Sequence, residues 1–234
     1  RELDDMMIQL GKHIRTEYLL KLKQQETEMK ALQHQIHPHF LYNTLEVIRS
    51  SSLQHQDEDT AEAVAALGAL FREIVKNEDR ITIGSELGLL QQYLKIMEFK
   101  YPEKFYYQYN VAKALHAVPT VKFWMQPLAE NFFVHGFNRE QEVNLLIVNG
   151  RDEGDRYRLE FIDNGTKIGE ERLAEIKRTL SREDNAPVDR IGLRNVYTRL
   201  SFFYGEGFSM DIRNNEEAGV TISVMIDKEA VPHV

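Results

Sequence analysis

The sequence has no cysteine, and its 234 residues include only six prolines and one tryptophan. The lack of cysteine excludes disulfides, thiolate metal ligands and cysteine nucleophiles. No apolar run approaches the ~20 residues that cross a bilayer, and there is no signal-peptide pattern. Basic residues are outnumbered, and the net charge is −8. A surface for binding a phosphate backbone is therefore not expected, and nucleic acid is not an expected partner.

The first part of the chain is predicted to be helical up to about residue 56. Apolar side chains recur there every three or four residues, with one phase slip, and there is no glycine or proline between Lys12 and His37. This pattern is typical of a coiled-coil seam in a dimer. Two further helices are predicted, one through residues 64–74 and one through 85–101. An antiparallel pair of such helices in each chain of a dimer would form a four-helix bundle.

The pattern changes after Pro102, where strands and helices alternate. We expect strands at residues 104–111, 143–149 and 156–163, and a last hairpin at 208–214 and 220–226, from alternating apolar and polar residues. Helices are expected at 121–137, 170–180 and 192–204. Strands joined as hairpins and interleaved with helices favour an α+β sandwich with helices on one face of a mixed sheet.

Three histidines, His34, His37 and His39, lie close together around Pro38. At about 100° per residue in a helix, His37 points to the apolar side and His39 to the opposite, polar side beside Asn43. Side chains on opposite sides cannot share one ion, which disfavours a metal site. His37 is better interpreted as a core or capping residue. An exposed His39 is either a plain surface residue or a nucleophile, because neutral imidazole is well populated near neutral pH.

A second group of polar residues lies further along the chain. Asn131 and His135 share a helix face, and an amide oxygen suits a hard cation such as Mg²⁺. Asp163, at a strand end before Gly165, suits the amino group of adenine. Gly192 begins a helix whose amides suit a polyphosphate. Each feature has a structural alternative: a solvated stripe, an ordinary turn or a plain helix cap.

Four segments together resemble the sensor histidine kinases of two-component systems, specifically the LytS/YesM-type group. The resemblance covers nearly the whole chain. Residues 1–30 are similar to the exit of a HAMP linker with its coiled coil. The segments are "LQHQIHPHFLYNTLE", "QPLAENFFVHG", "FIDNG" and "IGLRNVYTRLSFFYG".

The resemblance implies three parts: a HAMP exit and coiled-coil stalk (1–30), dimerisation and histidine phosphoacceptor helices (31–101), and an ATP-binding catalytic domain with a Bergerat-type (GHKL) α/β sandwich (102–234). It implies a homodimer on the cytoplasmic side of the cell membrane, with a membrane-spanning sensor portion missing from this chain. The phosphoryl group of Mg-ATP would pass through a histidine to an aspartate in the receiver domain of a response regulator.

Site residues follow from the same resemblance. His39 would be phosphorylated, with Asn43 within reach of its imidazole, and Glu130 resembles the general base of related ATPases. Residues 166–190 would form the ATP lid. The remaining positions would bind Mg-ATP: Asn131 as the Mg²⁺ ligand, Asp163 at the adenine amino group with Gly165 shaping its loop, His135 as a further nucleotide-binding residue, and Gly192 and Leu193 near the phosphates.

Three positions depart from the family pattern. His37 stands where asparagine is common, and Lys167 and Arg190 replace lid glycines. These changes leave open a weakened kinase, a phosphatase-biased sensor or a nucleotide-binding dimeric scaffold without transfer. A free-standing ATP hydrolase is a further possibility. Because Phe40 stands where many histidine kinases have an acid, the general base is not assigned.

Overall fold

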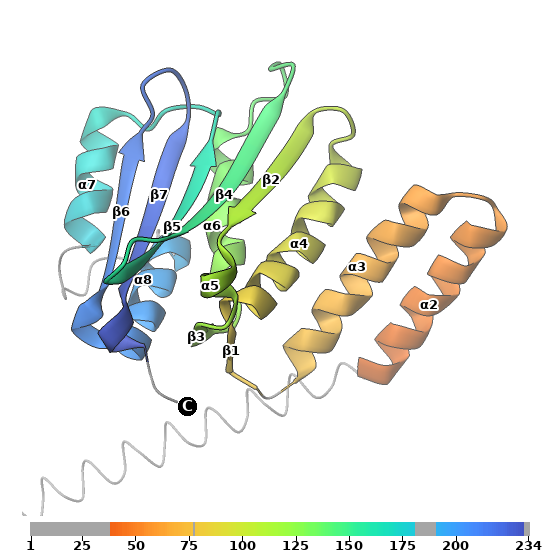
Figure 1. Ribbon diagram of the computed structural model, residues 1–234. Coiled ribbons are helices and arrows are strands. Elements are labelled where there is room, and N and C mark those ends of the chain that lie inside the picture. Colours follow the sequence, from red (N-terminus) through yellow and green to blue (C-terminus); the bar gives the residue numbers. More distant parts are fainter. Residues whose placement is uncertain (1–37, 77, 181–190, 232–234) are drawn as a thin grey trace, which may run out of the picture.

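The computed structural model describes residues 38–76, 78–180 and 191–231. It begins with an antiparallel hairpin of two helices, α2 (Pro38–Gln54) and α3 (Glu58–Val75), at one side of the molecule (Figure 1). Asp57 starts α3 by accepting a hydrogen bond from the Thr60 amide at 3.1 Å. The predicted coiled coil lies outside the described residues. Among the described residues, no helix is both long and apolar enough to cross a membrane.

The rest of the described chain is built on a five-stranded sheet. The strand order is β2-β4-β5-β7-β6, and β2 and β4 are parallel while the other neighbours are antiparallel. Alternation of apolar and polar side chains places one row of each strand in the core. The strands are β2 (Phe105–Val111), β4 (Asn144–Asp152), β5 (Arg156–Asp163), β6 (Phe208–Asn214) and β7 (Val220–Asp227).

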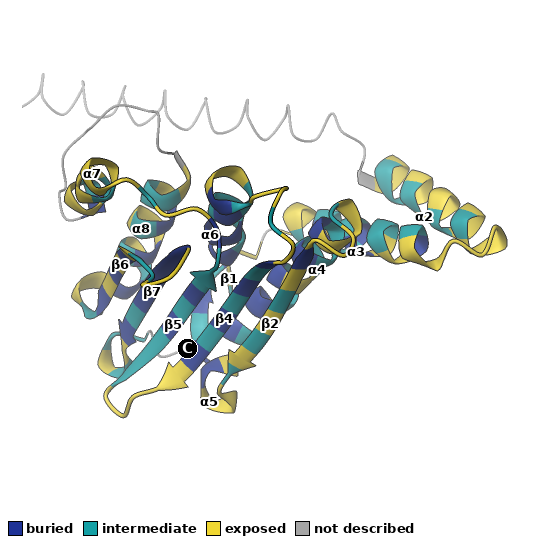
Figure 2. Cartoon of the chain, turned by 90° about the horizontal axis from the view of Figure 1, so that it is seen from above, coloured by how far each residue is buried: buried dark blue, intermediate teal, exposed yellow. Residues whose placement is uncertain are grey.

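Helices cover one face of this sheet, as the view in Figure 2 shows. They are α4 (Ile83–Lys100), α6 (Met125–Asn131), α7 (Glu170–Leu180) and α8 (Ile191–Tyr204). The expected α+β architecture, with helices on one face of a mixed sheet, is therefore confirmed. The four-helix bundle, which requires a second chain, stays a prediction.

The core is continuous across the predicted domain boundary between residues 101 and 102. Leu90 and Leu94 of α4 are buried in the same cluster as Phe105 of β2. Thus α4 packs against the sheet, although the prediction grouped it with the phosphoacceptor helices. In the hairpin, by contrast, apolar side chains remain exposed: Phe40, Val47, Ile48, Leu53, Ile74 and Val75.

The single helix predicted over residues 121–137 is wrong. Residues Pro119–Val121 form a short strand, β3, which pairs antiparallel with β1 (Arg80–Thr82). Helix α6 begins only at Met125, because Pro127 lacks an amide hydrogen and is tolerated only in the first turn. Its last residues continue as a π-helical turn, Phe132–Gly136. A minor helix, α5 (Lys113–His116), was also not predicted.

Candidate active site

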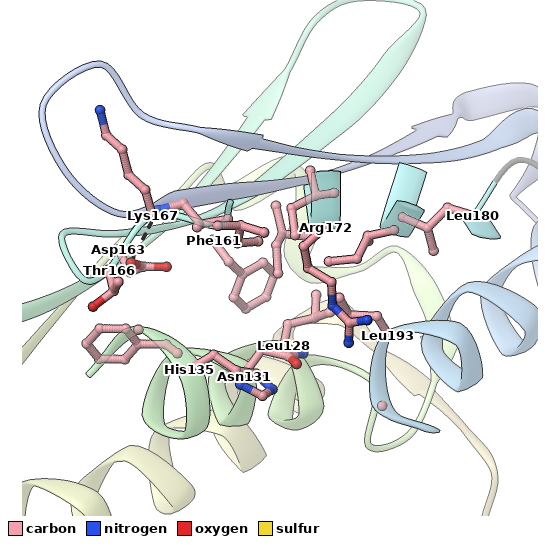
Figure 3. Close-up of a pocket in the computed structure, with 18 of the residues that line it drawn as sticks. Leu128, Asn131, His135, Phe161, Asp163, Thr166, Lys167, Arg172, Leu180 and Leu193 are labelled. Carbon is pink, nitrogen blue, oxygen red and sulfur yellow. Dashed lines mark hydrogen bonds between the residues drawn. The ribbon is translucent and has the colours of Figure 1, made fainter. Parts of the chain in front are cut away.

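A cavity of about 410 Å³ lies between the sheet and its covering helices (Figure 3). Its walls come from α6 and the π-helical turn, from the loop after β5, from α7 and from the start of α8. This volume is within the range typical of small-molecule sites. Apolar side chains form most of the inner wall, among them Leu128, Phe132, Leu146, Phe161, Ile212 and Ile222.

Asp163 is the one acidic side chain among the described residues that line this cavity. It ends β5, and its Oδ1 accepts hydrogen bonds from the amides of Gly165 (2.8 Å) and Val220 (3.2 Å). Burial raises the pKa of Asp163 to about 6, although these two amides act to lower it. A desolvated carboxyl group beside an apolar wall is suited to accept a hydrogen bond from a flat, largely apolar ring that carries an amino group.

The hairpin between β6 and β7 fixes the Asp163 loop, and these contacts were not predicted. Asn215 donates to the Asp163 carbonyl at 2.8 Å, and Asn214 exchanges hydrogen bonds of 2.9 and 2.8 Å with the backbone of Ile168. Gly219 adopts a positive φ of 81° against the Asp163 carbonyl, where a side chain would clash. The hairpin thus presets the loop before any ligand arrives.

Gly165 is where the loop approaches the π-helical turn most closely. A Cβ atom at Gly165 would lie 2.3 Å from the carbonyl oxygen of Gly136. The amide of the next residue, Thr166, donates to that same oxygen at 2.9 Å. Only glycine allows the two backbones this contact, which joins the Asp163 loop to the segment that carries Asn131 and His135.

Gly165→Ala should lower both stability and ligand binding, because the added methyl must push two backbone segments apart. We expect a loss of about 1–3 kcal/mol in the free energy of unfolding, the usual cost of overpacking. Urea unfolding measures it. Gly169→Ala is the matched control, since a Cβ at Gly169 meets nothing within 4 Å. An equal effect of the two substitutions would contradict the close-contact argument.

Asn131 and His135 both line the cavity, as their shared helix face predicted. Asn131 Nδ2 donates to the Pro127 carbonyl at 2.7 Å. Its Oδ1 is therefore the amide atom that remains to coordinate a cation. A π-helical turn directly follows Asn131. Turns of this kind are common at functional sites.

Gly192 and Leu193 lie at the start of α8, beside Asn131. An ideal Cβ at Gly192 would be 4.0 Å from Asn131 Nδ2, so the start of α8 lies next to the end of α6. Arg172 of α7 and Arg194 of α8 also line the cavity, and Arg172 extends across it in Figure 3. These arginines, which were not predicted, make this part of an acidic protein suited to an anion.

Lys167, one of the residues in place of a lid glycine, also has a partner. Its Nζ donates to the Glu216 carbonyl at 2.7 Å and extends away from the cavity in Figure 3. It therefore adds a further tie between the loop and the β6–β7 hairpin. Arg190 and lid residues 181–190 lie outside the described residues.

Glu130 is not among the residues that line the cavity. Its Oε1 accepts a hydrogen bond from Gln126 Nε2 at 2.8 Å, one turn earlier in α6. Adjacent residues of a helix are about 100° apart, so a helix that turns Asn131 to the cavity turns Glu130 away from it. Its predicted role as a base stays a prediction without support from this geometry.

His39 and Asn43 lie on α2, away from the cavity, and no residue of α2 lines it. His39 is exposed, as the helical phase predicted, and Asn43 Nδ2 is 3.3 Å from His39 Nδ1. This contact leaves Nε2 as the outward ring nitrogen. His34 and His37 lie outside the described residues.

The chain is similar to several known proteins. A family model described as histidine kinase matches residues 27–105. The sensor histidine kinase YesM of Bacillus subtilis is 28% identical over 86% of this chain and 33% of its own length. The sensor histidine kinase YpdA of Escherichia coli is 26% identical over 98% of this chain and 40% of its own length. The sensor protein LytS of Staphylococcus haemolyticus is 26% identical over 96% of this chain and 37% of its own length. The chain thus spans 33–40% of the length of these relatives.

Proposed function

Because the chain belongs to the LytS/YesM-type sensor histidine kinases, we propose that it transfers the γ-phosphoryl group of Mg-ATP to His39 and then to an aspartate of a response regulator. One observation carries the proposal. A single chain combines an exposed imidazole on a helical hairpin with a preset cavity that has a half-buried carboxyl group at one end and arginines at the other.

The residues of the cavity fit the parts of ATP. Asp163 would accept from the adenine amino group, and the apolar wall formed by Phe132, Phe161 and Ile222 would contact the ring. Arg172 and the amides at the start of α8 would hold the phosphates. Asn131 Oδ1 would be the protein ligand of Mg²⁺, whose contribution when bound is to neutralise phosphate charge. These features support the proposed Bergerat-type ATP site.

The transfer requires little covalent work from the protein. The Nε2 lone pair of His39 forms a bond to the γ-phosphorus, and the bond from that phosphorus to the bridging oxygen breaks. ADP leaves with that electron pair. Positioning and charge neutralisation supply most of the rate in such reactions. Since α2 contributes nothing to the cavity in this arrangement, the hairpin must move or His39 must serve the cavity of a partner chain.

Asn43 would set the tautomer of His39. A lone pair on Nε2 requires the proton on Nδ1, which then donates to the amide oxygen of Asn43. The observed contact has the amide nitrogen of Asn43 facing Nδ1. A half-turn of the Asn43 side-chain amide brings its oxygen to that position instead. Asn43 is thus a positioning residue, because it acts on the imidazole and not on the phosphate.

Asn43→Ala should slow phosphorylation of His39 about fivefold at saturating ATP and leave the KM for ATP unchanged, because one hydrogen bond contributes about 1 kcal/mol. Rates of labelling from γ-labelled ATP measure this. Asn43→Asp should keep nearly the parent rate, since a carboxylate also accepts from Nδ1–H. Ser50→Ala, on the same exposed face, is the control. A slow Asn43→Asp would show that Asn43 acts instead as a donor.

The exposed apolar side chains of α2 and α3 support a homodimer, in which a second copy would bury them. A receiver domain of a response regulator would then approach the exposed face of α2 around His39. We further propose that this kinase part lies on the cytoplasmic side of the cell membrane, following a sensor portion as in a membrane-bound receptor.

Incubation of the chain with γ-labelled ATP and Mg²⁺ tests the function. We expect acid-labile, base-stable label that maps to His39 by mass spectrometry and that is transferred to a receiver domain. Nucleotide binding without label would favour the dimeric scaffold, and release of phosphate without phosphohistidine would favour the hydrolase. Loss of label from an already phosphorylated receiver domain would reveal a phosphatase-biased sensor.

A further inference from the structure

The turn Lys122–Trp124 joins β3 to α6 and has an unusual backbone. Phe123 adopts a positive φ of 59°, which is uncommon for a residue that is not glycine. Such a conformation persists only where the surroundings determine it, and it is concentrated at active sites and switch regions. Three other elements contact this turn through charged side chains.

Glu86 of α4 holds the amide side of the turn. Its side chain is 1% exposed. One carboxylate oxygen accepts from the amide of Phe123 at 2.8 Å, and the other accepts from those of Trp124 and Met125 at 2.7 and 3.0 Å. Because α6 has no side-chain cap of its own, Glu86 supplies the acceptors that its first amides need. The position of α6, and hence of Asn131, depends on this carboxylate.

Arg199 of α8 holds the carbonyl side of the same turn. Its guanidinium donates to the carbonyls of Lys122 at 2.5 Å and Phe123 at 3.2 Å. It also exerts an attractive charge effect on Glu86. Two helices that line the cavity, α6 with Asn131 and α8 with Gly192, are therefore tied together at this turn.

Lys122 connects the turn to the helical hairpin. The Lys122 side chain is 5% exposed, and its Nζ donates to the Glu73 carbonyl at 3.2 Å and lies 3.5 Å from Glu73 Oε2. Glu73 is in the last turn of α3, where backbone carbonyls lack partners within the helix. Lys122 thus stabilises the end of α3 from a position directly before α6.

We propose that the turn Lys122–Trp124 couples the hairpin that carries His39 to the cavity, with Lys122 as the link to α3 and Glu86 and Arg199 as positioning residues for α6 and α8. This inference rests on the proposed function, because it treats the cavity as the nucleotide site. Coupling of this kind is reciprocal: if the orientation of α3 affects nucleotide binding, nucleotide binding must affect α3.

Hydrogen exchange tests the link in the full chain. In the parent, a nonhydrolysable ATP analogue with Mg²⁺ should slow amide exchange in residues 72–76 of α3 at least threefold. In Lys122→Met, which keeps the aliphatic stem but removes the ammonium group, this slowing should disappear while the Kd for the analogue changes less than twofold. Lys95→Met is the control, because it breaks a different ion pair between α4 and α3, Lys95–Glu62 at 3.8 Å.

Glu86→Gln tests the positioning role separately. The substitution replaces one carboxylate oxygen by an NH₂ group, which is a hydrogen-bond donor. This donor then faces a backbone N–H of the turn, which is also a donor. The Kd for the analogue should rise at least fivefold in a variant that circular dichroism shows to be folded, and Lys95→Met should leave it unchanged.

Undiminished slowing in Lys122→Met, or no slowing in a parent that binds the analogue, would overturn the coupling. An unchanged Kd in Glu86→Gln would overturn the positioning role. Calorimetry identifies the separate case in which the parent binds no nucleotide, and that result would overturn the proposed function and the inference together.

Discussion

His39→Ala should abolish the acid-labile label, a loss of at least 1,000-fold, and leave the Kd for the ATP analogue within a factor of two. The loss is complete because the substitution removes the atom that forms the bond to phosphorus, and an alanine methyl group has no lone pair to replace it. Nucleotide binding persists because no residue of α2 lines the cavity. Phosphoimaging after gel electrophoresis measures the first quantity, and calorimetry measures the second.

His55→Ala is the matched control. His55 is also exposed, directly follows α2, and places its Nδ1 2.7 Å from the Ser51 carbonyl oxygen. It differs from His39 in lacking a neighbouring asparagine, so its removal should leave labelling unchanged. If His39→Ala retains label, the assignment of the phosphoacceptor is wrong, and mapping of the remaining label would show which residue accepts the phosphate.

The orientation of His39 could be predicted because it depends only on helical periodicity. A spacing of four residues places Asn43 beside His39 in any regular helix, whatever the helix packs against. The exposed Phe40 and Val47 show the limit of this reasoning. Periodicity predicts an apolar side for this helix, but whether that side is buried depends on a partner surface, about which periodicity within one chain carries no information.

The strands of the main sheet could be predicted because each has several alternating residues, and four of them, β4 with β5 and β6 with β7, also form hairpins. The pair β1 and β3 was missed since each has three residues and its partner is almost forty positions away. The helix over residues 121–137 was extended too far toward its start for a related reason. The strand character of Pro119–Val121 comes from pairing with Arg80–Thr82, not from its own composition.

Within the site, the resemblance supplied the residues on the cavity walls, and the structure adds what holds them. Asn214 reads as the end of a strand, Asn215 as part of a polar turn and Glu86 as an ordinary helical glutamate, because a partner distant in sequence leaves no local signal. The direction of Glu130 could have been found from the sequence alone. Its neighbour Asn131 was predicted to face the ligand, and two adjacent helical residues do not share a face.

Asp163→Asn should have opposite effects on ligand binding and on the stability of the ligand-free protein. In the variant, the amide oxygen would accept from Gly165 and Val220, and the amide nitrogen would face the adenine amino group as a second donor. The affinity for ATP should fall about 10- to 100-fold, since a hydrogen bond to a charged group contributes about 1.5–3 kcal/mol.

The stability effect follows from the pKa of Asp163, which burial raises to about 6 from an ordinary value of 3.8. The folded state then binds a proton more tightly than the unfolded state, so ionised Asp163 destabilises the fold as pH rises through 6. At pH 8 the cost is about 3 kcal/mol, at roughly 1.4 kcal/mol per pKa unit. A neutral asparagine avoids it, so the ligand-free variant should be more stable than the parent at pH 8 and about equally stable at pH 4.

Urea unfolding at the two pH values, with calorimetric titration of the analogue, checks both effects. The parent should also lose affinity below pH 6 as Asp163 gains its proton, and the already weakened binding of the variant should not change over that range. Asp227→Asn is the control, because Asp227 is exposed at the end of β7 and should alter neither quantity. A variant that is less stable than the parent at pH 8 would mean that the ionised carboxyl group stabilises the loop through Gly165 and Val220 by more than its burial costs.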